Sequence, residues 1–150
     1  LHSEGKYAKE LALEGPSTSR WVPEIIAENN PDDESYYPYM NGQFVFKNAV
    51  VRFSEAIIEG LEANGLQKED INMLIPHQAN LRIAQFIQRK FQLNDDQVYN
   101  NIMNYGNTTA ASVIIALTEA WEKGKINDGD LVVLAAFGSG FTWGSVMVRW

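Results

Sequence analysis

The stretch 73–91, MLIPHQANLRIAQFIQRKF, changes within a few residues from a strand pattern to a helix pattern. Its start belongs to the apolar run INMLIP at 71–76, which is typical of a buried strand. Ile75 precedes Pro76 and is therefore biased toward extended backbone, so we expect the strand to end there. The apolar residues of 79–91 then recur at helical steps: Leu81, Ala84, Ile87 and Phe91. His77, the only histidine beyond residue 2, stands at the junction as a structural or a catalytic group.

The rest of the chain alternates in the same way. Helical spacing predicts one helix over 43–64 and another within 108–124, each ended by a glycine. The second is apolar nearly all round from Ala110 to Leu117, so we expect it to be buried on most sides. The strand patterns lie near 36–40, 71–76, 98–99, 130–137 and 144–150, and the turn GSGFTW joins the last two. This order predicts an α/β fold: a mixed five-stranded sheet with helices on both faces and a final antiparallel pair.

Composition excludes several classes of function. The 150 residues carry a formal net charge of −7, which argues against binding to nucleic acid or to an anionic membrane surface. The absence of cysteine excludes a disulfide, a thiolate metal site and a cysteine nucleophile within these residues. No apolar run approaches the roughly 18 residues that a membrane span needs. The first residue is Leu1, and we expect the chain to be a segment of something longer.

Three segments follow predicted strands at the edge of the sheet where α/β proteins gather functional groups. His77 follows the strand at 71–76, Asn107 follows the strand near 98–99, and FGSGF at 137–141 follows the strand at 130–137. An imidazole, an amide and exposed backbone N–H groups together form a donor-rich pocket suited to a developing oxyanion. The pattern therefore favours oxyanion chemistry if the three segments converge.

Each signal also has a structural interpretation. A lone histidine is often only a hydrogen-bonded structural residue, and Asn107 can cap the helix that follows it. GSGF can be a simple hairpin connection. A metal site is disfavoured because His77 has no second histidine or cysteine beside it in the pattern. Ser139 does not stand in a G-x-S-x-G elbow, and GSGFTWG does not match the dinucleotide-binding fingerprint.

Taken together, PHQANLRI, YGNTTAAS and AFGSGFTWGSVMVRW closely resemble the carboxy-terminal half of β-ketoacyl-acyl-carrier-protein synthase III, a thiolase-fold condensing enzyme. The resemblance covers nearly the whole chain. It implies that residues 1–35 are a crossover and variable loop from the missing amino-terminal half, and that 36–150 form a thiolase-like domain. It also implies decarboxylative condensation of acyl-coenzyme A with malonyl-acyl carrier protein at the start of type II fatty-acid synthesis.

The resemblance assigns roles to individual residues. His77 and Asn107 correspond to the catalytic pair that holds the malonyl thioester oxygen, and the nucleophilic cysteine belongs to the missing half. The backbone of Ser139 corresponds to an oxyanion donor for the acyl-cysteine. The positions that match the coenzyme A tunnel and the acyl pocket are Phe46, Ala79, Asn80 and Phe137.

Positive charges gather on one face of the helix predicted at 79–91. Arg82 and Arg89 are seven residues apart, about two turns, so they share one face, and Lys90 lies beside it. Charge alone favours an ordinary solvated face. The resemblance instead implies that Lys47, Arg82 and Arg89 dock an acidic carrier protein.

The resemblance also implies the wider setting. Acyl-coenzyme A is a substrate and no cofactor is expected; the partners are malonyl-acyl carrier protein, the chain's own amino-terminal half and a second copy in a homodimer. The enzyme is expected in the cytoplasm, and this segment alone is expected to be inactive. Two alternatives stay open: a thiolase-fold polyketide-type synthase, and a non-catalytic acyl- or carrier-binding module.

Overall fold

The structure is a computed structural model, and it describes residues 1–13 and 37–150. Its centre is a four-stranded sheet in the order β1 (His2–Ser3), β6 (Thr142–Arg149), β5 (Leu131–Gly138) and β4 (Met73–Pro76). β4 and β5 run parallel, whereas β5 and β6 form an antiparallel hairpin in which Gly138 pairs with Thr142. The sheet is therefore mixed, and the predicted pair at the end of the chain is confirmed.

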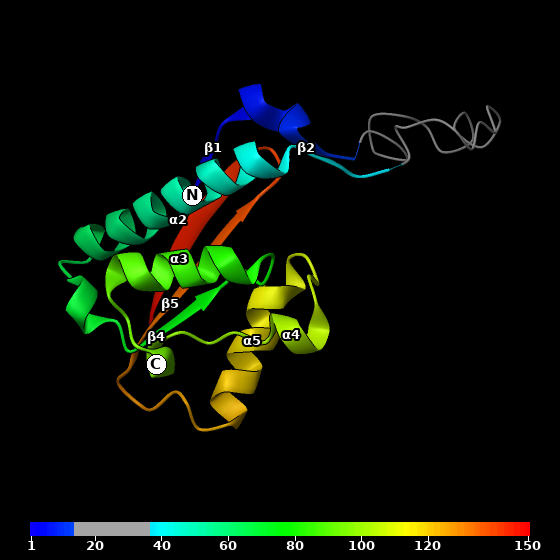
Figure 1. The fold of residues 1–150 in the computed structure, drawn as a ribbon. Helices are drawn as coiled ribbons and strands as arrows, with labels where there is room; N and C mark the ends of the chain where they lie inside the picture. Colours follow the sequence, from blue (N-terminus) through cyan, green and yellow to red (C-terminus); the bar gives the residue numbers. More distant parts are fainter. Residues whose placement is uncertain (14–36) are drawn as a thin grey trace, which may run out of the picture.

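Two helices cover one face of this sheet. α2 (Gly42–Ala63) and α3 (Leu81–Phe91) lie side by side across it (Figure 1). Alternate residues of β5 point toward them, because side chains of a strand alternate between its two faces. Those residues join the larger hydrophobic core: Leu131, Val133, Ala135 and Phe137. Both helices were predicted from their spacing, and both are confirmed.

The opposite face is covered by α5 (Ala111–Glu122). Its small residues Ala116 and Ala120 pack with Met73, Ile75 and Val132 in a second core. The expectation that this helix is buried on most sides is wrong for the described residues. The small side chains face the sheet and larger ones point outward, so that Ile114 is 58% and Trp121 54% exposed.

Smaller elements complete the chain. The segment predicted near 36–40 is β3 (Tyr39–Met40), which pairs with β2 (Leu11–Ala12) in a separate two-stranded sheet. Near 98–99 only Val98 bridges Leu74, in the parallel sense, so this segment touches the main sheet without forming a regular strand. The main sheet therefore has four regular strands in the described residues and not the predicted five. The short helices are η1 (Gly5–Glu10), η3 (Lys68–Asp70), η4 (Asp95–Gln97) and α4 (Ile102–Tyr105).

The thiolase-like α/β class predicted from the sequence is confirmed by this mixed sheet with helices on both faces. The expected boundary at residues 35 and 36 lies outside the described residues, as does most of the expected variable loop. In the part of the chain that the structure describes, no helix is both long enough and apolar enough to cross a membrane.

Candidate active site

A large groove of about 1340 Å³ opens at the carboxyl ends of β4 and β5. Its walls come from α2, the start of α3, the loop before α5 and the turn between β5 and β6. The groove brings together nine of the ten residues to which the sequence assigned a role: Phe46, Lys47, His77, Ala79, Asn80, Arg82, Asn107, Phe137 and Ser139. Arg89 does not line it. The three chemical segments therefore converge on one groove, which is the condition that oxyanion chemistry required.

His77 is held at the end of β4 by the sheet itself. Its backbone N–H donates to the carbonyl of Ala135 over 2.8 Å, which extends the pairing of β4 with β5 by one residue. Its ring is half-buried, and Nδ1 lies 2.5 Å from the hydroxyl of Ser112 on α5. Burial lowers the pKa of the imidazole below its ordinary value of 6.5, because a charged ring loses hydration there. His77 is therefore a neutral imidazole near pH 7.

Gln78, the next residue, is buried and ties the His77 loop to the segment that leads to Asn107. Its Oε1 accepts the backbone N–H groups of Asn101 and Ile102, over 3.0 and 3.1 Å. Its Nε2 donates to the carbonyl of Pro76 over 2.7 Å. One side chain thus satisfies backbone groups of both segments, and buried polar groups require such partners.

Asn107 lies in the exposed loop between α4 and α5. Its Oδ1 accepts the backbone N–H of Thr109 over 2.8 Å, so the amide NH₂ is left to donate to a ligand in the groove. Thr109 has φ +54°, which is strained for a β-branched residue. The N-cap of α5 is Ala110, so the alternative in which Asn107 caps this helix is wrong.

The glycine-rich turn closes the groove beside His77. Ser139 is exposed, and its carbonyl accepts the hydroxyl of Thr142 over 3.0 Å. Phe137, just before it, is buried and packs its ring against Phe141 with the ring centroids 4.9 Å apart. An exposed polar backbone therefore borders a rigid aromatic wall.

The rim of the groove is partly cationic. Lys47 reaches it from α2 and Arg82 from the first turn of α3, and both side chains are exposed. Asn80 also has a structural task, since its side chain accepts the N–H of Arg82 over 2.9 Å and caps α3. Arg89 lies two turns further along α3, exposed but away from the groove.

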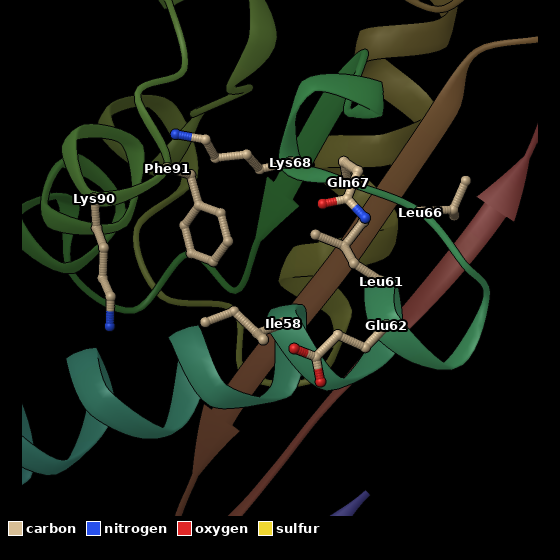
Figure 2. A pocket seen from close by; sticks show the side chains of 8 residues that line it. All are labelled: Ile58, Leu61, Glu62, Leu66, Gln67, Lys68, Lys90 and Phe91. Atoms are coloured by element: carbon tan, nitrogen blue, oxygen red, sulfur yellow. The ribbon is translucent and has the colours of Figure 1, made fainter.

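A second pocket of about 330 Å³ lies between the carboxyl-terminal parts of α2 and α3 (Figure 2). Phe91 and Leu61 form apolar walls, and the side chains of Lys90 and Lys68 stand at its edge. None of the residues predicted to bind substrate or to catalyse lines it. The larger groove is therefore the candidate active site.

Sequence reasoning missed Ser112 and Gln78, although both stand inside the quoted motifs. The available signal for Ser112 was its spacing: it lies four and eight residues before Ala116 and Ala120, on the buried face of α5. A polar residue on such a face needs a partner. Gln78 offered no comparable signal, because the two N–H groups that its Oε1 accepts lie more than 20 residues away in the sequence.

Solved structures with a similar fold include 3-oxoacyl-[acyl-carrier-protein] synthases III. A 3-oxoacyl-[acyl-carrier-protein] synthase III from Aquifex aeolicus superposes with a TM-score of 0.83 and 36% identity, covering 99% of this chain and 42% of that one. The β-ketoacyl-[acyl-carrier-protein] synthase III of Thermus thermophilus superposes with a TM-score of 0.83 and 40% identity. The match covers 99% of this chain and 44% of that one. The chain is thus a thiolase-like α/β protein.

Sequence comparison leads to the family. The β-ketoacyl-[acyl-carrier-protein] synthase III of Caldanaerobacter subterraneus is 53% identical over 112 residues, 75% of this chain and 34% of that protein. That of Rhodospirillum centenum is 42% identical over 151 aligned positions, 100% of this chain and 43% of that protein. The family model for the carboxy-terminal part of 3-oxoacyl-[acyl-carrier-protein] synthase III matches residues 61–150. The chain belongs to this family, and it spans about two fifths of the length of the relatives that it matches most fully.

Proposed function

We propose that this chain is the carboxy-terminal part of a β-ketoacyl-acyl-carrier-protein synthase III. The complete enzyme would condense the acyl group of acyl-coenzyme A with malonyl-acyl carrier protein and release carbon dioxide. The observation that carries the proposal is the convergence of His77, Asn107 and the Ser139 turn on one groove in a chain of this family.

His77 and Asn107 act on the malonyl thioester. When the bond to the carboxylate breaks, its electron pair moves toward the thioester oxygen and carbon dioxide leaves. The amide NH₂ of Asn107 and a ring N–H of His77 donate to that enolate oxygen in a partly dehydrated groove. Donors already in place stabilise such charge more than mobile water does.

The enolate carbon then attacks the acyl thioester. The new carbon–carbon bond forms as negative charge develops on the acyl oxygen, and the backbone N–H of Ser139 stabilises that charge. Collapse of this intermediate expels the thiolate of the acylated cysteine. These 150 residues contain no cysteine, so the amino-terminal half must supply that thiol, and the segment alone is inactive.

The groove offers separate surfaces for the parts of the substrates. Phe137 stands beside the acyl group, whereas Phe46, Ala79 and Asn80 line the approach taken by the pantetheine arm of coenzyme A or of the carrier. Half-buried Phe46 gives this approach an apolar wall, and Asn80 adds a polar group near its mouth. A long, mostly apolar thioester arm fits such a groove.

The carrier protein docks on the cationic residues Lys47, Arg82 and Arg89. Two of them border the groove, and α3 carries no acidic residue although the chain has a net charge of −7. Arg82→Ala in the full-length enzyme is expected to raise KM for malonyl-carrier more than KM for acyl-coenzyme A, and added salt is expected to shrink the difference. The matched control is Lys125→Ala, an exposed cation outside the groove. Equal effects of Arg82→Ala on both substrates would contradict the docking site.

The amino-terminal half is proposed to cover the outer face of α5 and the neighbouring part of β6. Apolar side chains are exposed there, including Ile114 and Val146, at 58% and 56%. Exposed apolar area of this kind marks an interaction surface. Purified alone, the segment is expected to aggregate or to bind an amino-terminal half; a monomeric, cooperatively folded segment would contradict this. A homodimer and a cytoplasmic location complete the proposal.

A polyketide-type synthase is the second candidate, because the priming β-ketosynthase of the R1128 polyketide pathway superposes with a TM-score of 0.77 at 26% identity. The identities of 36% to 53% to the four synthase III proteins named above favour fatty-acid synthesis. Acyl and carrier preferences of the complete enzyme separate the two. A non-catalytic acyl- or carrier-binding module would instead lack an upstream cysteine.

The proposal is tested on the full-length polypeptide that carries this segment. Incubation with acetyl-coenzyme A alone is expected to add one acetyl group, mapped by mass spectrometry to a cysteine outside these residues. Malonyl-carrier is then expected to discharge it with release of carbon dioxide. No acyl-enzyme with any short acyl donor, and no decarboxylation of malonyl-carrier, would overturn the proposed function.

A further inference from the structure

The hydroxyl of Ser112 contacts the catalytic loop from the far side of the sheet. Ser112 lies in the first turn of α5 with only 2% of its surface exposed. Its Oγ lies 2.5 Å from Nδ1 of His77 and 3.1 Å from the backbone nitrogen of Gln78. A buried hydroxyl therefore joins two consecutive residues at the end of β4.

The protons in this cluster can be assigned by their partners. A backbone N–H can only donate, so the N–H of Gln78 occupies one lone pair of the Ser112 oxygen. Among the described residues, Nδ1 of His77 is the one acceptor that the hydroxyl proton contacts. If Nδ1 carried a proton instead, the proton of this buried hydroxyl would have no acceptor there, which is unfavourable.

The other ring nitrogen follows from this assignment. A neutral imidazole carries one proton, and an unprotonated Nδ1 leaves that proton on Nε2. Nε2 of His77 has no protein partner among the described residues, and the ring lines the groove. The groove therefore receives an N–H donor from His77 and not a bare nitrogen.

We infer that Ser112 is a positioning residue that fixes His77 as the Nε2–H tautomer, so that its free nitrogen donates to the thioester enolate. The inference rests on the proposed function for its catalytic meaning, but the tautomer itself is a property of the folded protein. Burial of His77 acts in the same direction, because it disfavours the doubly protonated ring.

The direct test is the tautomer in the unmodified full-length protein. Histidine labelled with ¹⁵N in the ring shows, through its couplings to the ring carbon-bound protons, which nitrogen carries hydrogen; His77→Gln identifies the signals. We expect His77 protonated on Nε2 at neutral pH. A proton on Nδ1 would overturn the inference, whatever any variant does.

The second test removes the hydroxyl. Ser112→Ala is expected to mix the two tautomers and to slow malonyl-carrier decarboxylation about 10-fold, because hydrogen-bond partners that orient an imidazole typically carry effects of this size. Acyl transfer from acetyl-coenzyme A, which does not use His77 in the proposed scheme, is expected to change less than about twofold. Ser112→Thr, which keeps a hydroxyl, is expected to restore part of the rate.

The matched control is Ser54→Ala. Ser54 is also a buried helical serine, but its hydroxyl donates to the carbonyl of Val50 within α2, away from the groove. It is expected to leave both half-reactions and the His77 signals unchanged. Equal loss in both half-reactions for Ser112→Ala, or an unchanged tautomer, would make Ser112 merely structural and overturn the inference.

Failure of this inference can be told apart from failure of the proposed function. An Nε2–H signal in a protein that decarboxylates no malonyl-carrier would leave the assignment of the proton intact and remove its catalytic meaning. Decarboxylation with an Nδ1–H signal would support the proposed function and reject the role of Ser112.

Discussion

His77 and Asn107 line the same groove, yet the fold holds them in different ways. His77 continues β4, and its ring Nδ1 lies against a buried hydroxyl on the helix of the opposite face. Asn107 is exposed, and within the described part of the chain its side chain makes one hydrogen bond, to the backbone two residues away. The first donor is placed by the sheet, the second by its own loop.

The difference shows that two side chains of one groove can be positioned in two ways, one by a β-strand and the other by a loop. The segment that leads to Asn107 is attached to the end of β4 through Gln78. The side chain of Gln78 accepts the backbone N–H groups of Asn101 and Ile102. Asn101 adds a hydrogen bond from its side chain to Glu119 on α5, over 2.7 Å. Positioning is therefore shared by a buried network and a short strained turn.

The largest effect is expected from removing either donor. His77→Ala and Asn107→Ala in the full-length enzyme are each expected to slow malonyl-carrier decarboxylation by about 10² to 10³, the usual effect of losing one oxyanion donor. Because both are proposed to act on one oxygen, the double variant is expected to lose less than the product of the two. If both single variants decarboxylate malonyl-carrier within threefold of the parent rate, the proposed pair of donors is rejected. Ser54→Ala is the control and is expected to keep the parent rate.

Gln78→Met tests whether the Gln78 side chain holds the His77 loop and the segment at Asn101 and Ile102 together. It leaves one buried and one part-buried N–H group without their acceptor, so the free energy of unfolding is expected to fall by about 2 to 4 kcal/mol. Urea unfolding of the full-length protein measures this. Gln85→Met, an exposed position on α3, is the matched control and is expected to change stability by less than about 0.5 kcal/mol. Similar losses of unfolding free energy in both variants would show that Gln78 does not hold the two segments together.

The pH dependence of stability separates His77 from Asn107. The pKa of His77 is lowered in the folded protein, so the unfolded chain binds its proton more readily. Its contribution to stability is complete above pH 6.5, the ordinary pKa, and is lost as pH falls toward the folded pKa, with a slope of at most about 1.4 kcal/mol per pH unit. His77→Gln is expected to remove this part of the slope in urea titrations, whereas Asn107→Ala keeps it. Identical slopes in parent and His77→Gln would contradict the lowered pKa.

The smallest effect is expected in the turn that holds Asn107. Thr109→Gly removes the strain of a β-branched residue at positive φ, but it also raises the conformational entropy of the unfolded chain. The free energy of unfolding is expected to rise by up to about 1 kcal/mol. The control is Thr108→Gly, because Thr108 is the neighbouring residue and has no positive φ. This variant is expected to lower the free energy of unfolding by about 0.5 to 1 kcal/mol. The two midpoints of thermal unfolding compare them, and a loss in both would show that Thr109 is not strained.

Several elements could be predicted because their signals are local. The spacing of apolar residues located α2 and α3, and the unbroken apolar run of β5 followed by a glycine-rich turn located the final hairpin. The burial of α5 was predicted wrongly, because a run that is apolar nearly all round does not reveal that its small residues pack inward and Ile114 outward. The strand predicted near Val98 is one bridge to Leu74, because strand propensity depends on the tertiary context more than on the residue types themselves.

By itself the sequence determined the order of helices and strands, the residue types at the ends of the strands and, through its motifs, the resemblance to one family. These depend on periodicity and on neighbours in the chain, which sequence records directly. Only the tertiary structure decided that Ser112 meets Nδ1 of His77, that Gln78 joins two loops, and that Arg82 borders the groove while Arg89 does not. Those contacts join residues up to 35 positions apart, and they depend on how α5 and α3 pack on the sheet, which no local pattern encodes.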